Sequence, residues 1–234
     1  SADHYLDIKR VRQAGSWETP AGIAWDDLRA ALEKTASTLS QCERLPSSLV
    51  VGGFSRGPLE LVQSGQGGKL LGSEPLVVII EGFLLYSDKK LCDMLDIQLW
   101  IETTGELCAR RRYNREGRRG PFERYSESFH AEVWNHYERY RGEQLANVPK
   151  VQRLDGALEP PSILRNAAIY CREKGVSAPA PSSLKDEAAE APARRRVVLV
   201  GIGGSSASGK STLTRSLVQE LNSPLNGFSA DHYL

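Results

Sequence analysis

Apolar residues along this chain follow two patterns. Short runs with almost no polar residue, typical of strands buried on both faces, occur at 76–80, 97–101, 197–200 and, more weakly, 151–154 and 227–229. Apolar residues three or four positions apart predict helices at about 26–39, 105–116, 127–143, 160–173 and 210–221. This alternation predicts an α/β fold with a mainly parallel sheet, covered on both faces, that binds ligands at the carboxyl ends of its strands.

Two segments interrupt the alternation. Residues 175–193 are rich in Pro, Ala, Ser and charged residues and have little to bury, so they predict a flexible linker. Residues 45–75 are rich in glycine, and we expect a mobile excursion or hairpin there, with short strands at 49–51 and 59–62. No Lys-Ser or Lys-Thr pair follows these glycines, which disfavours a phosphate-binding loop in this segment.

Composition narrows the class of protein. A length of 234 residues with 40% hydrophobic and 25% charged residues suits one globular domain. The net charge of +1 gives no argument for nucleic acid or a membrane as partner, and no apolar run approaches the length of a membrane span. Four cysteines at unrelated spacings favour reduced thiols in a cytoplasmic protein over a zinc site or disulfides.

One segment carries a specific phosphate-binding pattern. Residues 204–211 match G-x-x-x-x-G-K-[ST] and lie between the strand at 197–200 and a helix. Backbone N–H groups of such a loop and the helix N-terminus bind phosphates, Lys210 can reach the β- and γ-phosphates, and the Ser211 hydroxyl can ligate Mg²⁺. We therefore expect a nucleoside triphosphate to bind at Gly204, Ser205, Ser206, Ala207, Ser208, Gly209, Lys210, Ser211 and Thr212.

The position of this loop is unusual. Such a loop normally follows the first strand of its domain, yet only residues 212–234 follow Ser211. The last six residues, 229–234, repeat the first six, 1–6, as Ser-Ala-Asp-His-Tyr-Leu. This repeat is too short to be a structural unit, and we interpret it as the mark of a circular permutation.

A permuted chain would read from about residue 194 to 234 and continue at residue 7. We expect one domain in which 194–234 supplies the phosphate-loop strand and helix, while 1–174 supplies the rest, including the substrate region and a lid. The linker 175–193 would then join two ends that are free in the unpermuted order.

Two strand-end carboxylates are candidates for catalysis. Glu81 follows the strand at 76–80, where the acidic partner of a Mg²⁺ site usually lies in phosphate-loop folds, so it could hold metal-bound water or a substrate hydroxyl. Asp231 follows the strand at 227–229 and could be the general base for an attacking hydroxyl. Asp3, its copy in the first hexapeptide, is the other candidate for this role. Ordinary alternatives are a strand-end acid for Glu81 and a helix cap or turn for the aspartate.

A cluster of arginines and a Trp-Asp pair complete the candidates. The arginines suit a lid that closes over ATP. The alternatives are a solvated face or a nucleic-acid patch, and the near-zero net charge of the chain disfavours nucleic acid. Trp25 could stack on a base while Asp26 accepts hydrogen bonds from ribose hydroxyls, or Trp25 could be a core residue beside an N-capping Asp26. The arginines are Arg110, Arg111, Arg112, Arg115, Arg118 and Arg119.

In the rotated order these motifs resemble the nucleoside kinases of the P-loop superfamily, and most closely the nicotinamide riboside kinases. The resemblance implies a three-layer fold like that of nucleoside monophosphate kinases, with a central parallel sheet and an Arg-rich lid. The segments that carry it are 203–212, 229–231, 25–26, 79–86, 108–112, 133–141 and 154–156.

The resemblance implies transfer of the ATP γ-phosphoryl group to the 5′-hydroxyl of nicotinamide riboside, with Mg²⁺, in NAD salvage. The second aromatic residue around the base remains open between Tyr125 and Phe129. The implied roles are Asp3 or Asp231 as base, Lys210, Arg110 and Arg112 on ATP, Ser211 and Glu81 on the metal, Asp26 and Arg115 on the ribose, and Trp25 against the pyridinium ring.

Two other functions remain as alternatives, a uridine or cytidine kinase and a non-catalytic nucleotide-binding protein. We expect only small-molecule partners, with no nucleic acid and no membrane. The protein should be a monomer, or a domain-swapped dimer if Asp3 occupies the site and displaces the C-terminal copy.

Overall fold

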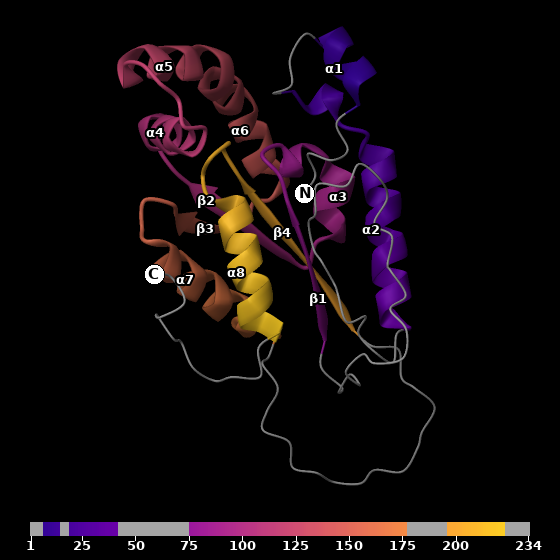
Figure 1. The fold of residues 1–234 in the computed structure, drawn as a ribbon. Helices are drawn as coiled ribbons and strands as arrows, with labels where there is room; N and C mark the ends of the chain where they lie inside the picture. The colour runs from indigo at the N-terminus through magenta and orange to yellow at the C-terminus, as the bar shows by residue number, and fades with distance from the viewer. Residues whose placement is uncertain (1–6, 15–18, 42–74, 177–195, 223–234) are drawn as a thin grey trace, which may run out of the picture.

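The computed structural model of this chain describes residues 7–14, 19–41, 75–176 and 196–222 (Figure 1). Several expectations fall outside these ranges. They concern both copies of the hexapeptide with Asp3 and Asp231, the strand at 227–229, the strands at 49–51 and 59–62, and almost all of the linker.

The described strands form one parallel sheet in the order β1-β4-β2-β3. The last of them along the chain, β4, lies between β1 and β2 (Figure 1). This parallel sheet confirms the α/β class that the continuous apolar runs predicted. The strands are β1 (Leu76–Glu81), β2 (Ile97–Glu102), β3 (Gln152–Asp155) and β4 (Val197–Gly204).

Strand β4 is longer than its apolar run predicts, because it continues through three glycines and Ile202 to Gly204. Glycine normally weakens a strand unless something approaches its backbone closely. Here the ring of Tyr86 does so: a Cβ at Gly201 would lie 3.1 Å from Tyr86 Cε1, and one at Gly203 would lie 2.6 Å from Tyr86 Cε2. Absence of a side chain at these positions therefore allows the aromatic ring to cover the strand.

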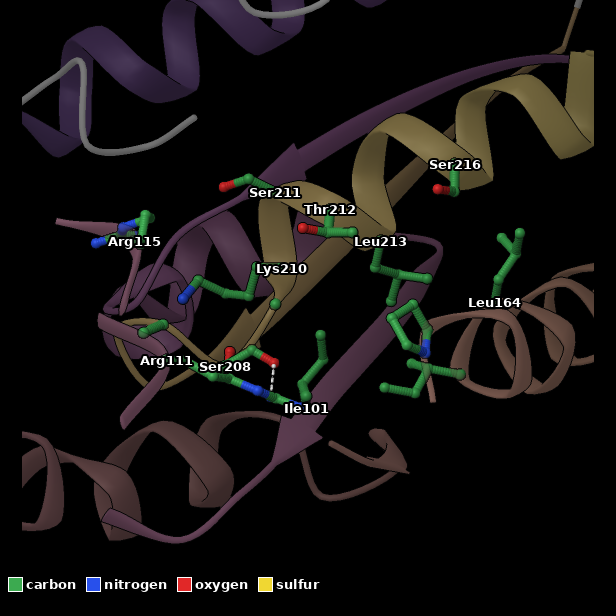
Figure 2. A pocket seen from close by; sticks show the side chains of 14 residues that line it. Ile101, Arg111, Arg115, Leu164, Ser208, Lys210, Ser211, Thr212, Leu213 and Ser216 are labelled. Carbon is green, nitrogen blue, oxygen red and sulfur yellow. Dashed lines mark hydrogen bonds between the residues drawn. The ribbon is translucent and has the colours of Figure 1, made fainter. Parts of the chain in front are cut away.

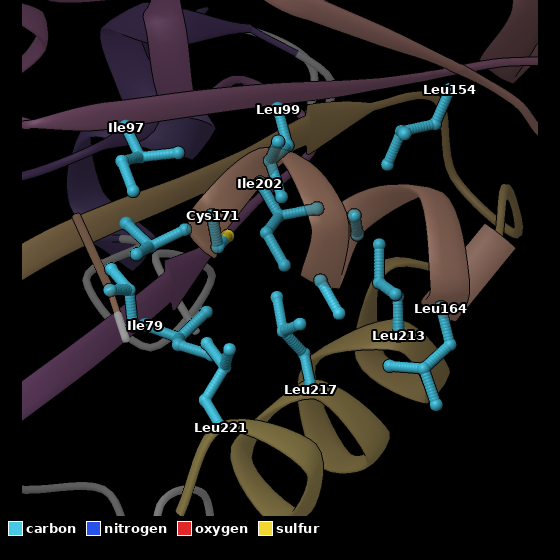
Figure 3. Packing of buried hydrophobic residues seen from close by; sticks show 14 of the residues in the cluster. Ile79, Ile97, Leu99, Leu154, Leu164, Cys171, Ile202, Leu213, Leu217 and Leu221 are labelled. Carbon is cyan, nitrogen blue, oxygen red and sulfur yellow. The ribbon is translucent and has the colours of Figure 1, made fainter. Parts of the chain in front are cut away.

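One face of the sheet is covered by α7 (Pro160–Glu173) and α8 (Lys210–Asn222). Their apolar stripes pack on alternate residues of the four strands to form the first core (Figure 3). Leu217 of α8 and Ala167 of α7 are fully buried there against Ile202 of β4 and Leu99 of β2. This core fixes the first turn of α8, and hence the phosphate loop, against the end of the sheet.

The opposite face carries a second core. It unites Ile80 of β1 and Trp100 of β2 with residues of α2 and of the segment after β1. The elements on this side are α1 (Ile8–Ala14), η2 (Pro20–Gly22), α2 (Trp25–Ser40), η3 (Leu85–Ser87), α3 (Lys89–Met94) and α6 (Asn135–Asn147).

The predicted N-cap of α2 is wrong. The helix begins at Trp25 with Ala24 at the cap position, so Asp26 lies within the first turn. A carboxylate in the first turn still interacts favourably with the positive end of the helix. Asp26 therefore suits a helix start without capping it.

The third group of helices lies at the carboxyl ends of the strands (Figure 1). Helix α4 (Gly105–Arg115) packs against α5 (Phe122–Phe129), which continues through a π-helical turn, η4 (His130–Trp134), into α6. The helix predicted at 127–143 is thus wrong in its bounds, since helical structure begins after Pro121. Proline fixes an extended residue there and is well tolerated at a helix start.

Candidate active site

The turn from the end of β4 into α8 has a backbone suited to an anion. Three of its residues have positive φ: Gly204 (137°), Ala207 (62°) and Gly209 (105°). Gly204 must be glycine, because a Cβ there would lie 2.7 Å from the carbonyl oxygen of Ile101. Left-handed residues within such a turn direct successive N–H groups to one side, and the N-terminus of α8 adds its positive end. The loop therefore forms an anion-binding concavity directly before Lys210.

A pocket of about 270 Å³ opens beside this loop (Figure 2). Its lining combines cationic side chains from α4 and α8 with apolar side chains from β2 and α7, a mixture suited to a phosphate chain bearing a flat organic group. Residues 207–212 of the predicted binding loop line it, whereas residues 204–206 do not belong to its lining. The lining residues outside that loop are Ile101, Arg111, Arg115, Pro160, Ile163, Leu164, Leu213 and Ser216.

The two residues predicted to hold the metal lie next to each other. Glu81 is buried at the end of β1, and the Ser211 hydroxyl in the first turn of α8 donates to its Oε1 across 3.3 Å. Nearby, Lys210 Nζ donates to the carbonyl oxygen of Ser205 at 2.6 Å. A hydroxyl and a carboxylate are the hard oxygen ligands that Mg²⁺ takes, alongside phosphate oxygens and water. This pair of oxygens therefore fits the metal.

The arginine cluster is divided between two sides of α4. Arg111 and Arg115, one helical turn apart, face the pocket. Arg111 also donates to two carbonyl oxygens, from Nη1 to Ser208 at 3.2 Å and from Nη2 to Gly156 at 2.8 Å. It thereby connects the phosphate loop to the turn after β3.

The two arginines predicted for ATP, Arg110 and Arg112, are absent from the described lining of the pocket. The guanidinium of Arg110 lies 4.2 Å from the centre of the Phe122 ring on α5, and it pairs with Glu106. Arg112 pairs with Glu116, which also binds Arg118. Hydrogen bonds, mainly from Arg112 and also from Arg118, hold the pKa of Glu116 below its ordinary value. These arginines therefore help to join α4, α5 and the turn between them.

Trp25 and Asp26 lie on the other side of the sheet from the pocket, at the start of α2. Trp25 Nε1 donates to the Pro20 carbonyl oxygen at 3.0 Å, and the half-buried ring packs on the second core. The side chain of Asp26 is 92% exposed and pairs with Arg29. Arg115, predicted to share the ribose with Asp26, lines the pocket beside the phosphate loop and approaches Glu116 at 4.0 Å.

The two candidates for a second aromatic residue differ in burial. Phe129 is only 3% exposed and packs on Cys108 and Ala109 in the core beneath α4 and α5. Tyr125 is half-buried, with its ring 5.4 Å from that of Tyr113, and burial raises the pKa of its hydroxyl. Only Tyr125 of this pair keeps an accessible ring, so it remains the candidate.

Sequence reasoning missed a polar contact behind the phosphate loop. Cys108 Sγ lies 2.9 Å from Thr103 Oγ1 and 3.1 Å from Ser205 Oγ, and the two hydroxyls are 3.1 Å apart. The cluster joins the end of β2, helix α4 and the loop. Sequence offers little signal for it, because Thr103 and Ser205 are ordinary polar residues far apart along the chain.

A central strand ending in this loop, with a carboxylate at the end of the next strand and an arginine helix above, defines an α/β fold of the P-loop kinase type. Within the described residues, no helix combines the length and apolar character needed to cross a membrane.

Comparisons with known proteins agree with this class. The chain is similar to nicotinamide riboside kinase 2 of Mus musculus, at 30% identity over 142 residues that cover 58% of this chain and 63% of the mouse protein. It is also similar to nicotinamide riboside kinase 2 of Homo sapiens, at 33% identity over 84 residues that cover 36% of this chain and 35% of the human protein. These matches confirm the resemblance to nicotinamide riboside kinases, although the chain spans less than two thirds of the length of either relative. No family model and no solved structure matches.

Proposed function

We propose that this chain is a nucleoside kinase that transfers the γ-phosphoryl group of ATP to the 5′-hydroxyl of nicotinamide riboside. The observation that carries the proposal is the contact of Ser211 with Glu81 beside Lys210, at the mouth of an anion-binding loop. The similarity to nicotinamide riboside kinase 2 of mouse and human supports the choice of nucleoside. The buried free thiols of Cys92, Cys108 and Cys171 suit the cytoplasm, which we propose as the compartment.

Catalysis of phosphoryl transfer depends mainly on positioning and on neutralising charge. The loop amides and Lys210 would bind the β- and γ-phosphates, while Ser211 and Glu81 would hold Mg²⁺, which neutralises charge on the phosphate oxygens. Arg115 faces the same pocket and would add positive charge there. The apolar residues of α7 would pack against the adenine.

The acceptor would enter from the side of α2. Its 5′-oxygen forms the new bond to the γ-phosphorus, the bond to the β-phosphate bridging oxygen breaks, ADP leaves, and the hydroxyl proton goes to a base. We propose Asp3 or Asp231 for that base, and Trp25 and Asp26 as contacts to the pyridinium ring and the ribose.

We also propose that the chain is a circular permutant. Two observations support this: the last described strand is central in the sheet, and the side chain of Arg196, just after the linker, reaches Gly175 at its start. A Cβ at Gly175 would lie 3.4 Å from Arg196 Nη1. A side chain from one end of the linker thus reaches the other end, as expected where two chain ends can be joined without disturbing a domain.

The test is phosphorylation of nicotinamide riboside and uridine by the purified chain with Mg²⁺-ATP, with ADP and both monophosphates quantified by chromatography. We expect nicotinamide mononucleotide to form and Lys210→Met to abolish it. Formation of uridine monophosphate alone would replace the proposal with a pyrimidine nucleoside kinase. ATP binding without either product would identify a non-catalytic nucleotide-binding protein.

A further inference from the structure

Arg29 lies between two carboxylates that come from different parts of the chain. Its Nη1 donates to Asp88 Oδ2 at 2.6 Å, and its Nη2 donates to Asp26 Oδ1. The side chains of Arg29 and Asp88 are only 15% and 17% exposed, whereas that of Asp26 is 92% exposed. One end of this chain of ion pairs is therefore held within the protein, and the other end faces solvent.

Asp88 is a firm anchor for the guanidinium. Its Oδ1 accepts from the backbone N–H of Leu91 at 2.6 Å, so it caps helix α3. It directly follows η3, in which Leu85 and Tyr86 are fully buried. Arg29 thus ties the first turns of α2 to the segment that follows Glu81 at the end of β1.

This arrangement contributes little stability through the Asp26 pair itself. An exposed ion pair is screened by water and contributes about 0–1 kcal/mol. The planar guanidinium, however, presents its donors in a fixed geometry. With one nitrogen held by Asp88, the other can hold one oxygen of Asp26 in place at little further cost in side-chain entropy.

We propose that Arg29 is a positioning residue for the nucleoside, which fixes Oδ1 of Asp26 and leaves Oδ2 to accept from the ribose hydroxyls. This inference rests on the proposed role of Asp26. The Asp26 contact is made equally before and during phosphoryl transfer, so its loss should change KM for the nucleoside and leave kcat unchanged.

The experiment measures KM for nicotinamide riboside, KM for ATP, kcat and Tm for Arg29→Met, Arg29→Lys, Asp88→Asn and Asp26→Asn. Arg29→Met should raise KM for the nucleoside about tenfold, with kcat, Tm and KM for ATP nearly unchanged. Arg29→Lys should return KM for the nucleoside only partly to the parent value, because an ammonium group cannot reproduce the two-pronged set of donors of a guanidinium. Asp88→Asn keeps an acceptor for Leu91 and should reproduce part of the Arg29→Met effect.

Asp93→Asn is the matched control, since it removes an exposed ion pair with Lys89 on the same helix α3. It should change none of the four quantities. The double variant Asp26→Asn, Arg29→Met should have the nucleoside KM of Asp26→Asn alone, because Arg29 acts through Asp26.

The outcomes separate this inference from the function on which it rests. If Asp26→Asn raises the nucleoside KM and Arg29→Met does not, the positioning role is wrong and the proposed function stands. If Asp26→Asn has no effect while nicotinamide riboside is still phosphorylated, Asp26 is not a substrate contact and the inference falls with it. If Arg29→Met lowers Tm and raises KM for ATP and for the nucleoside equally, Arg29 has a purely structural role and the proposal is overturned.

Discussion

The phenolic oxygen of Tyr86 lies 2.7 Å from the carbonyl oxygen of Gly201, within the sheet. It also accepts from the backbone N–H of Leu99 at 3.1 Å. One side chain thus hydrogen-bonds to the backbones of both β2 and β4, where the sheet must hold the phosphate loop. Burial of the hydroxyl raises its pKa well above the ordinary value, so it keeps its proton.

Tyr86→Phe should lower the free energy of unfolding by about 1–3 kcal/mol, because buried backbone groups lose their partner. Urea denaturation measures this loss. Tyr113→Phe is the matched control, since that hydroxyl bonds to Gly120 at an exposed site. Equal stability of the two variants would contradict a structural role for the buried hydroxyl.

Gly203→Ala and Gly142→Ala should have opposite effects. A Cβ at Gly203 would lie 2.6 Å from Tyr86 Cε2 and 2.8 Å from Trp100 Cε3, so overpacking should cost about 1–3 kcal/mol. A Cβ at Gly142, inside α6, would meet nothing within 4 Å, so alanine there should add about 0.5–1 kcal/mol through helix propensity. Thermal unfolding of the two variants should give Tm values on either side of the parent.

Arg111→Ala should raise KM for ATP about tenfold or more, because its two charge-assisted bonds shape the pocket. Arg110→Ala should change it less than twofold, since Arg110 stacks on Phe122 and pairs with Glu106. Steady-state kinetics at varied ATP concentration compares them. A larger effect at Arg110 would favour the prediction made from sequence over the geometry.

Ser211→Ala and Glu81→Gln should each lower kcat about 10²-fold or more and raise the Mg²⁺ concentration needed for half-maximal rate. Ser211→Ala removes an oxygen ligand from the proposed metal site, and Glu81→Gln removes the negative charge and one of the two carboxylate oxygens, while both leave the loop backbone intact. The rate is measured against Mg²⁺ at saturating ATP. An unchanged Mg²⁺ requirement in both variants would argue that the ion binds elsewhere.

Glu116 should make stability near α4 depend on pH. Its pKa is lowered from 4.5 in the folded state, so its stabilisation is complete above that value and is lost as pH falls through the lower, folded-state pKa. Glu116→Gln should therefore lower stability at pH 7, by less than about 1 kcal/mol because the pair is partly exposed. The Tm difference from the parent should shrink steadily as pH falls below 4.5, and a difference that does not shrink would have another cause.

Sequence predicted the elements better than the side-chain contacts. The apolar runs of β1, β2 and β4 identified the sheet because a strand buried on both faces has little room for polar residues. The sequence showed the arginine cluster but not which of its members face the pocket. The packing of α4 on α5 decides that Arg111 and Arg115 face it while Arg110 stacks on Phe122. The spacing of Arg111 and Arg115 was the signal available.

Other contacts had no local signal at all. Arg29 and Asp88 are separated by the whole segment between α2 and α3, so no spacing rule could pair them. The N-cap of α2 was misplaced because carboxylates are favoured both at the cap and within the first turn. Helix α5 was predicted to begin too late, since charged residues separate its aromatic positions.

The central place of β4 has a consequence for how the protein folds. Its first pairing, Leu76 with Val197, joins residues that are far apart in sequence, and its other edge pairs with β2. Until the ribosome has released β4, β1 and β2 each keep an unsatisfied edge with no strand between them. We therefore expect slow folding, with a risk of aggregation until β4 has paired, since non-local strand pairing is slow and exposed edges favour aggregation.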